Sequence, residues 1–96
     1  MEEVNIGIIG LGNVGTGTIT ILAENADQIA LKLGFRLKVV AACSLDVHER
    51  NLPAALGNVM KTTDWRAVVT HPDVQIVVEV VGGTTVAAEI FAAVAW

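Results

Sequence analysis

The sequence has few charges, one cysteine and no long uninterrupted hydrophobic run. Only 17% of its 96 residues are charged, against about a quarter in a typical globular domain, so we expect part of the surface to be covered by something else. A single cysteine, Cys43, excludes an intrachain disulfide and favours a reducing compartment, the cytoplasm. Glu79, Gly82–Gly83 and Glu89 interrupt the apolar segments, which are shorter than the about 18 residues of a membrane span.

Positive charge is also scarce. Six Lys and Arg stand against ten Asp and Glu, which gives a formal net charge of −4. Nucleic acids and anionic membranes are bound by clusters of positive charge, so we expect neither partner. The hydrophobic content of 53% excludes intrinsic disorder and suits one small core.

Apolar, non-alternating segments alternate with helical ones along the chain. We expect strands at residues 4–9, 37–43, 59–61 and 74–81, and helices at residues 14–33, 65–70 and 84–96. Residues 44–58 are predicted to be mostly loop, with a weak helical turn near residues 54–56. Helices between continuous apolar strands predict an α/β fold in which a parallel sheet is buried on both faces.

The first predicted helix is long and strongly periodic. Its apolar residues recur every three or four positions, at Ile19, Leu22, Ala23, Ala26, Ile29, Ala30 and Leu33. Gly34 follows the last of them, where a glycine commonly ends a helix in the left-handed conformation. The last predicted helix, in contrast, reaches Trp96 with no glycine or proline and no following strand. We therefore expect the sheet to be truncated at its C-terminal end.

Gly10, Gly12 and Gly15 form a G-x-G-x-x-G pattern between the first strand and the first helix. Gly10 suits the tight turn, Gly12 lets a pyrophosphate approach the backbone, and Gly15 lets the helix pack closely on the strand. The N–H groups at Asn13 and Val14 then face the phosphates at the positive end of the helix. The pattern predicts a Rossmann-type dinucleotide-binding domain with helices on both faces of its sheet.

The second half of this fingerprint departs from the usual pattern. A carboxylate is expected at the tip of the second strand, where it binds a ribose 2′-hydroxyl. Here Cys43 and Ser44 occupy the tip, and Asp46 and Arg50 come later. Such a tip accepts either a 2′-hydroxyl or a 2′-phosphate, so the choice between NAD and NADP stays open.

Gly82 and Gly83 form a second candidate site, since they follow the strand at residues 74–81 at the edge where α/β sheets bind ligands. His48 and His71 have no partner at metal-ligand spacing, and we expect both at the surface and no metal site. Trp65 is expected in the core, whereas Glu79 is either exposed at an edge or hydrogen-bonded near the site. No nucleophile is paired with a base, so we expect no catalytic residue in this chain.

The segments IGIIGLGNVGTG, ILAENADQIALKLG, TTDW and HPDVQIVVEVVGGTTVAAEI together resemble the NAD(P)-binding domain of homoserine dehydrogenases. The resemblance implies that residues 1–96 are the N-terminal part of that domain. It implies that Gly10, Gly12, Asn13, Val14 and Gly15 hold the pyrophosphate, that Cys43 and Ser44 hold the adenosine ribose, and that Val81, Gly82 and Gly83 approach the nicotinamide.

The same resemblance implies an oxidoreductase that uses NADP or NAD to interconvert L-homoserine and L-aspartate 4-semialdehyde, in threonine and methionine biosynthesis. Its catalytic, substrate-binding and dimerisation region is expected outside this chain, in a homodimeric full-length enzyme. We therefore expect the chain alone to be inactive. Two other interpretations fit the glycine loop, a nucleotide-sensing Rossmann module without enzymatic activity and an S-adenosylmethionine-binding domain.

Overall fold

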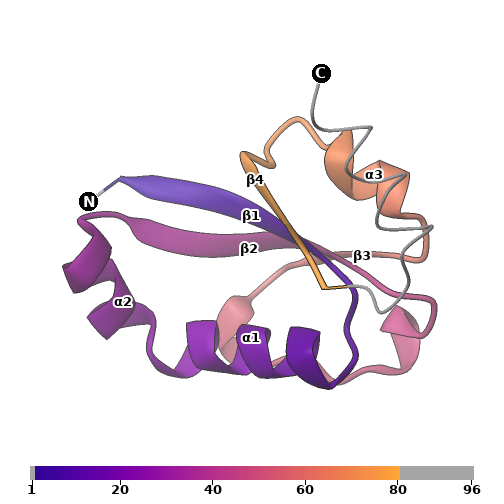
Figure 1. The fold of residues 1–96 in the computed structure, drawn as a ribbon, viewed down its shortest axis with the longest axis horizontal. Coiled ribbons are helices and arrows are strands. Elements are labelled where there is room, and N and C mark those ends of the chain that lie inside the picture. The colour runs from indigo at the N-terminus through magenta and orange to yellow at the C-terminus, as the bar shows by residue number, and fades with distance from the viewer. Residues whose placement is uncertain (1, 81–96) are drawn as a thin grey trace.

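Figure 1 shows the computed structural model, which describes residues 2–80 as a parallel sheet between helices. The strands are β1 (Glu3–Ile9), β2 (Arg36–Cys43), β3 (Met60–Thr62) and β4 (Ile76–Glu79). The helices are α1 (Asn13–Glu24), α2 (Ala26–Leu33) and α3 (Trp65–Val69), with short 3₁₀ turns η1 (Val47–Glu49) and η2 (Ala54–Leu56). The strand order is β3-β2-β1-β4 and every pair is parallel, which confirms the predicted α/β Rossmann-type fold.

The sheet separates two apolar clusters. In β1, Ile6 and Ile8 pack with Ile19 of α1 on one face, while Ile9 packs with Val68 of α3 on the other. Figure 1 shows the same division, with α1 and α2 along one side of the sheet and α3 along the opposite side. Because both faces are covered, the strands need no polar alternation, and the predicted continuous apolar runs are explained.

Gly7 allows α3 to lie close to β1. A Cβ placed on Gly7 would lie 2.5 Å from Cγ1 of Val68 and 3.3 Å from both methyl carbons of Val74. The first contact is too short for real atoms and the other two are tight, so a side chain at position 7 would push Val68 and α3 away from the central strand.

The predicted single helix over residues 14–33 is wrong, because the chain forms two helices that meet at Asn25. Asn25 leaves the helical conformation, with φ −117° and ψ 23°, and its side-chain amide donates to the carbonyl of Ile21 at 3.2 Å. Asparagine competes in this way for backbone groups and so interrupts helices. The predicted end is confirmed, since Gly34 caps α2 with φ 82°.

The segment between β2 and β3 contains more structure than the sequence indicates. The predicted turn near residues 54–56 is present as η2, and the short strand is present as β3, one residue later than predicted. Val47 of η1 is fully buried in the core cluster on the α1 side, although its sequence neighbours are polar. Val81, Gly82, Gly83 and the helix predicted over residues 84–96 lie outside the described residues.

Candidate functional site

The carboxyl ends of the strands enclose a cleft of about 620 Å³ beside the glycine loop. Two backbone hydrogen bonds hold the strand ends together. The N–H of Gly10 donates to the carbonyl of Cys43 (2.8 Å), and the N–H of Val80 donates to the carbonyl of Ile9 (2.9 Å). The residues lining the cleft are Ile9, Gly10, Gly12, Cys43, Ser44, Leu45, Asp46, Thr63, Trp65 and Val80. The cleft thus lies at the edge of the sheet where open α/β folds bind ligands.

Gly10 and Gly15 set the shape of the loop. Gly10 has a φ of 102°, which favours glycine, and the chain turns there from β1 towards α1. A Cβ on Gly15 would overlap the carbonyl oxygen of Gly10 and lie 3.1 Å from Cγ2 of Val80. The hydroxyl of Thr16 donates to the carbonyl of Leu11 at 2.8 Å, and the Leu11 side chain is buried in the core. The loop is therefore packed tightly against the strand, as predicted for Gly15.

Gly12 differs from Gly15 because its surroundings are open. No atom lies within 4 Å of a Cβ built on Gly12, and the residue is exposed at the wall of the cleft. Its backbone (φ −67°, ψ −162°) is extended and accessible to any residue. The missing side chain is therefore not needed for packing among the described residues, and it leaves space in the cleft.

Helix α1 begins at Asn13, directly after Gly12, with its N-terminus at the cleft. Among the residues that the structure describes, no side chain caps this end, and its first turn contains no acidic residue. The first N–H groups of a helix have no partner within the helix and carry its partial positive charge. Backbone groups of Asn13, Val14 and Gly15 can therefore bind an anion at this wall.

At the tip of β2, three polar side chains form a hydrogen-bonded network. The hydroxyl of Ser44 donates to Oδ1 of Asp46 at 2.6 Å, and Nε of Arg50 donates to Oδ2 at 3.0 Å. The bond from Ser44 and the charge of Arg50 lower the pKa of Asp46 despite an opposing desolvation effect. Asp46 is therefore a carboxylate at neutral pH, and its side chain is 45% exposed.

Cys43 is buried at the end of β2, in agreement with its interpretation as a small strand-end residue. Burial, and secondly the nearby carboxylate of Asp64, raises the pKa of its thiol. The thiol is accordingly protonated at neutral pH, which is the unreactive form. Cys43 contributes shape to the cleft wall rather than a nucleophile.

Trp65 is half-buried rather than fully in the core. It packs against the apolar cluster on the α3 side, lines the cleft and carries the guanidinium of Arg66 4.5 Å from its ring centre. The sequence reasoning placed Trp65 in the core and did not assign Thr63 to the site. Their place in the sequence could have indicated that they line the cleft, since both residues follow the carboxyl end of β3.

Both histidines lie in the part of the chain that the structure describes, whereas the second pair of glycines does not. His48 is exposed, and Nδ1 of His71 accepts a hydrogen bond from the N–H of Asp73 at 3.0 Å. Within residues 2–80, no three His, Cys, Asp or Glu side chains come together as a metal site. No helix in the same part of the chain is long and apolar enough to cross a membrane. Val81, Gly82 and Gly83 lie beyond the described part, so their predicted role stays a prediction.

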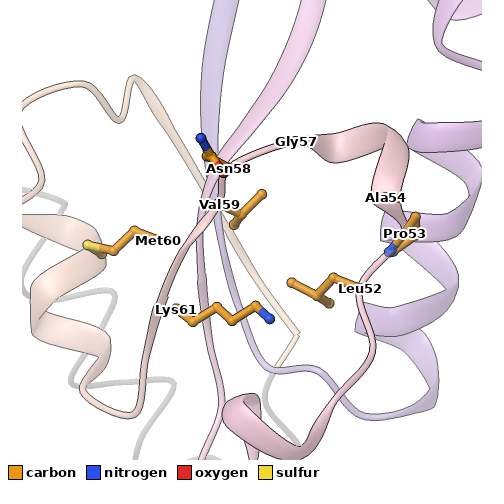
Figure 2. Close-up of a pocket in the computed structure, with 8 residues that line it drawn as sticks. All are labelled: Leu52, Pro53, Ala54, Gly57, Asn58, Val59, Met60 and Lys61. Carbon is orange, nitrogen blue, oxygen red and sulfur yellow. The ribbon is translucent and has the colours of Figure 1, made fainter.

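A second groove of about 450 Å³ lies along β3 and shares no lining residue with the cleft. Figure 2 shows Leu52 and Lys61 extending towards the same space from opposite sides, while Met60 points away from it. Neither the glycine loop at Gly10 and Gly12 nor the start of α1 lines this groove. We therefore place the candidate site at the cleft.

Comparison with known proteins identifies related sequences and structures. Residues 10–95 match the family model described as the NAD-binding domain of homoserine dehydrogenase. The homoserine dehydrogenase of Methylobacillus glycogenes is 38% identical over 94 residues, which cover 94% of this chain and 22% of the relative. That of Synechocystis is 43% identical over 81 residues, covering 83% of this chain and 18% of the relative. The crystal structure of the Thiobacillus denitrificans enzyme superposes with a TM-score of 0.83 at 35% identity, over 98% of this chain and 21% of that one. This chain thus spans about a fifth of the length of the proteins it matches.

Proposed function

This chain belongs to the homoserine dehydrogenase family through the NAD-binding domain of those enzymes, and we propose that its cleft binds NAD or NADP. The observation that carries the proposal is the open space at Gly12, directly before the uncapped N-terminus of α1. A pyrophosphate needs both a backbone without a side chain and unpaired N–H groups at a helix end. In this proposal Gly10, Gly12, Asn13, Val14 and Gly15 hold the pyrophosphate.

The remaining cofactor contacts follow from the positions of the strands. Cys43 and Ser44 bind the adenosine ribose at the tip of β2, since both line the cleft. Val81, Gly82 and Gly83 approach the nicotinamide side after β4, and Val80, which follows the end of β4, also lines the cleft. Ile9 and Val80 supply apolar walls that limit water around the bound molecule.

For the full gene product we propose the interconversion of L-homoserine and L-aspartate 4-semialdehyde in the cytoplasm, by a homodimer. The nicotinamide supplies the redox chemistry by carrying a hydride. Residues 1–96 are the N-terminal part of the dinucleotide-binding domain in this proposal, and they position the cofactor. The groups that bind the substrate and move its protons belong to the region outside this chain.

Calorimetric titration of the full gene product with NAD, NADP and S-adenosylmethionine tests the proposal. We expect saturable binding of at least one dinucleotide and no binding of S-adenosylmethionine. Reduction of the nicotinamide on addition of L-homoserine, followed at its near-ultraviolet absorbance, tests the proposed reaction. Binding of S-adenosylmethionine alone contradicts the cofactor assignment, while dinucleotide binding without turnover supports a sensing module.

A further inference from the structure

The charge of the cleft comes from a single side chain among the described residues that line it. Asp46 is the only Asp, Glu, Lys or Arg in that lining, and its carboxylate stands beyond the tip of β2. The sequence places it two residues after Ser44, where the fingerprint does not predict a ribose ligand. The turn at Ser44 to Asp46 nevertheless brings the carboxylate to the cleft wall, where the Ser44 hydroxyl holds it at 2.6 Å.

Arg50 forms an ion pair with this carboxylate. Its Nε lies 3.0 Å from Oδ2 of Asp46, and the two side chains are 35% and 45% exposed. Arg50 is not among the cleft-lining residues. It therefore helps to hold Asp46 in place, and the carboxylate offsets part of its positive charge.

These positions have opposite consequences for the two dinucleotides. The 2′-hydroxyl of NAD can donate to a carboxylate oxygen, which accepts more than one hydrogen bond. The 2′-phosphate of NADP carries nearly two negative charges at neutral pH, and beside Asp46 it meets a like charge. Arg50 is the cation paired with Asp46, so any attraction it offers the phosphate is partly offset by the carboxylate beside it.

From this arrangement we infer that the chain selects NAD over NADP, with Asp46 as the discriminating residue and Arg50 as a positioning residue for it. The inference rests on the proposed function and deepens it, because it chooses between the two cofactors. The expected preference is about tenfold or more in dissociation constant, the size associated with about 1.4 kcal/mol.

The test is a titration of the full gene product with NAD and with NADP under the same salt conditions. The variants are Asp46→Asn and Arg50→Gln. Asp27→Asn is the matched control, because Asp27 also pairs with an arginine, Arg36 at 3.1 Å, and lies outside the cleft. Asp46→Asn and Asp27→Asn both remove one negative charge, so a non-specific effect of net charge on binding would appear in this control as well.

We expect the unmodified protein and the Asp27→Asn variant to bind NAD about tenfold more tightly than NADP. Asp46→Asn should reduce this ratio to near one, mainly by strengthening NADP binding. Arg50→Gln should not weaken NADP relative to NAD. A selective loss of NADP binding in Arg50→Gln, or equal or tighter NADP binding by the unmodified protein, overturns the inference. Failure to bind either dinucleotide instead contradicts the proposed function itself, so the two failures are distinguishable.

Discussion

At the scale of single residues, two glycines of the loop have opposite surroundings. A side chain on Gly15 would overlap the carbonyl of Gly10, so this glycine is required by packing. A Cβ on Gly12 would have no atom of the described residues within 4 Å, so the fold tolerates residues other than glycine at this position. We therefore attribute the glycine at position 12 to ligand binding, and a substitution can test this.

Gly12→Thr should weaken dinucleotide binding while leaving the fold intact. Threonine and glycine are similarly favoured as N-caps, and the extended backbone of Gly12 suits a β-branched residue. We expect the free energy of unfolding to change by less than about 0.5 kcal/mol and dinucleotide affinity to fall by about tenfold or more. Chemical denaturation and calorimetry measure the two quantities.

Gly17→Ala serves as the control for this substitution. Gly17 also has no atom within 4 Å of a built Cβ, but it lies inside α1 and does not line the cleft. The Gly17→Ala variant should bind the dinucleotide normally and be more stable by up to about 1 kcal/mol, because alanine has a higher helix propensity than glycine. Normal affinity in Gly12→Thr would show that the loop does not hold phosphate.

Cys43 should make stability depend on pH in the alkaline range. Burial raises the pKa of its thiol above the ordinary value of a cysteine, so the folded chain favours the protonated form more than the unfolded chain does. This contribution is present below the unfolded-state pKa and is lost as pH rises through the folded-state pKa. We expect the unfolding midpoint in denaturant to fall more steeply above about pH 9 in the unmodified protein than in Cys43→Ala. Parallel pH profiles would contradict the buried, protonated thiol.

At the scale of elements, α3 is short and depends on its cap. The Asp64 carboxylate accepts a hydrogen bond from the N–H of Arg66 at 3.0 Å, and Thr62 accepts from the N–H of Asp64 at 3.1 Å. The helix has five residues, too few to be stable without such contacts. It also supplies Val68 to the core and Trp65 to the cleft, so the cap supports both.

Asp64→Ala should therefore destabilise the protein by about 1 kcal/mol, the usual value of an N-cap hydrogen bond. Asp64→Asn should lose much less, because asparagine caps helices about as well as aspartate. Thermal or denaturant unfolding of the two variants makes the comparison. Equal losses in both would show that the charge of Asp64, rather than its cap hydrogen bond, stabilises this region.

The elements also show what can be predicted from the sequence. Strands β1 and β2, the turn at Gly10 and the end of α2 at Gly34 follow from local patterns of apolar residues and glycine. The break at Asn25 was missed because an unbroken apolar stripe continues across it. The burial of Val47 depends on packing between segments that are distant in sequence. Local patterns contain no information on such contacts.

At the scale of the whole molecule, the cleft is assembled from separate parts of the chain. Its walls come from β1, the start of α1, the tip of β2 and the residues around β3, α3 and β4. A molecule bound there contacts segments that are distant in sequence and that meet only in the folded chain. Binding to the folded state alone raises stability by an amount set by the ratio of ligand concentration to dissociation constant.

Saturating NAD should therefore stabilise the full gene product against thermal unfolding. At a concentration of about 100 times the dissociation constant, the expected gain is about 2.7 kcal/mol. The same concentration of NADP should raise the unfolding temperature less, since Asp46 disfavours its phosphate, and both shifts should be smaller in Gly12→Thr. Scanning calorimetry with and without each dinucleotide measures these shifts. An NAD shift of unchanged size in Gly12→Thr would place the dinucleotide away from the glycine loop, because a threonine side chain there occupies the space before α1.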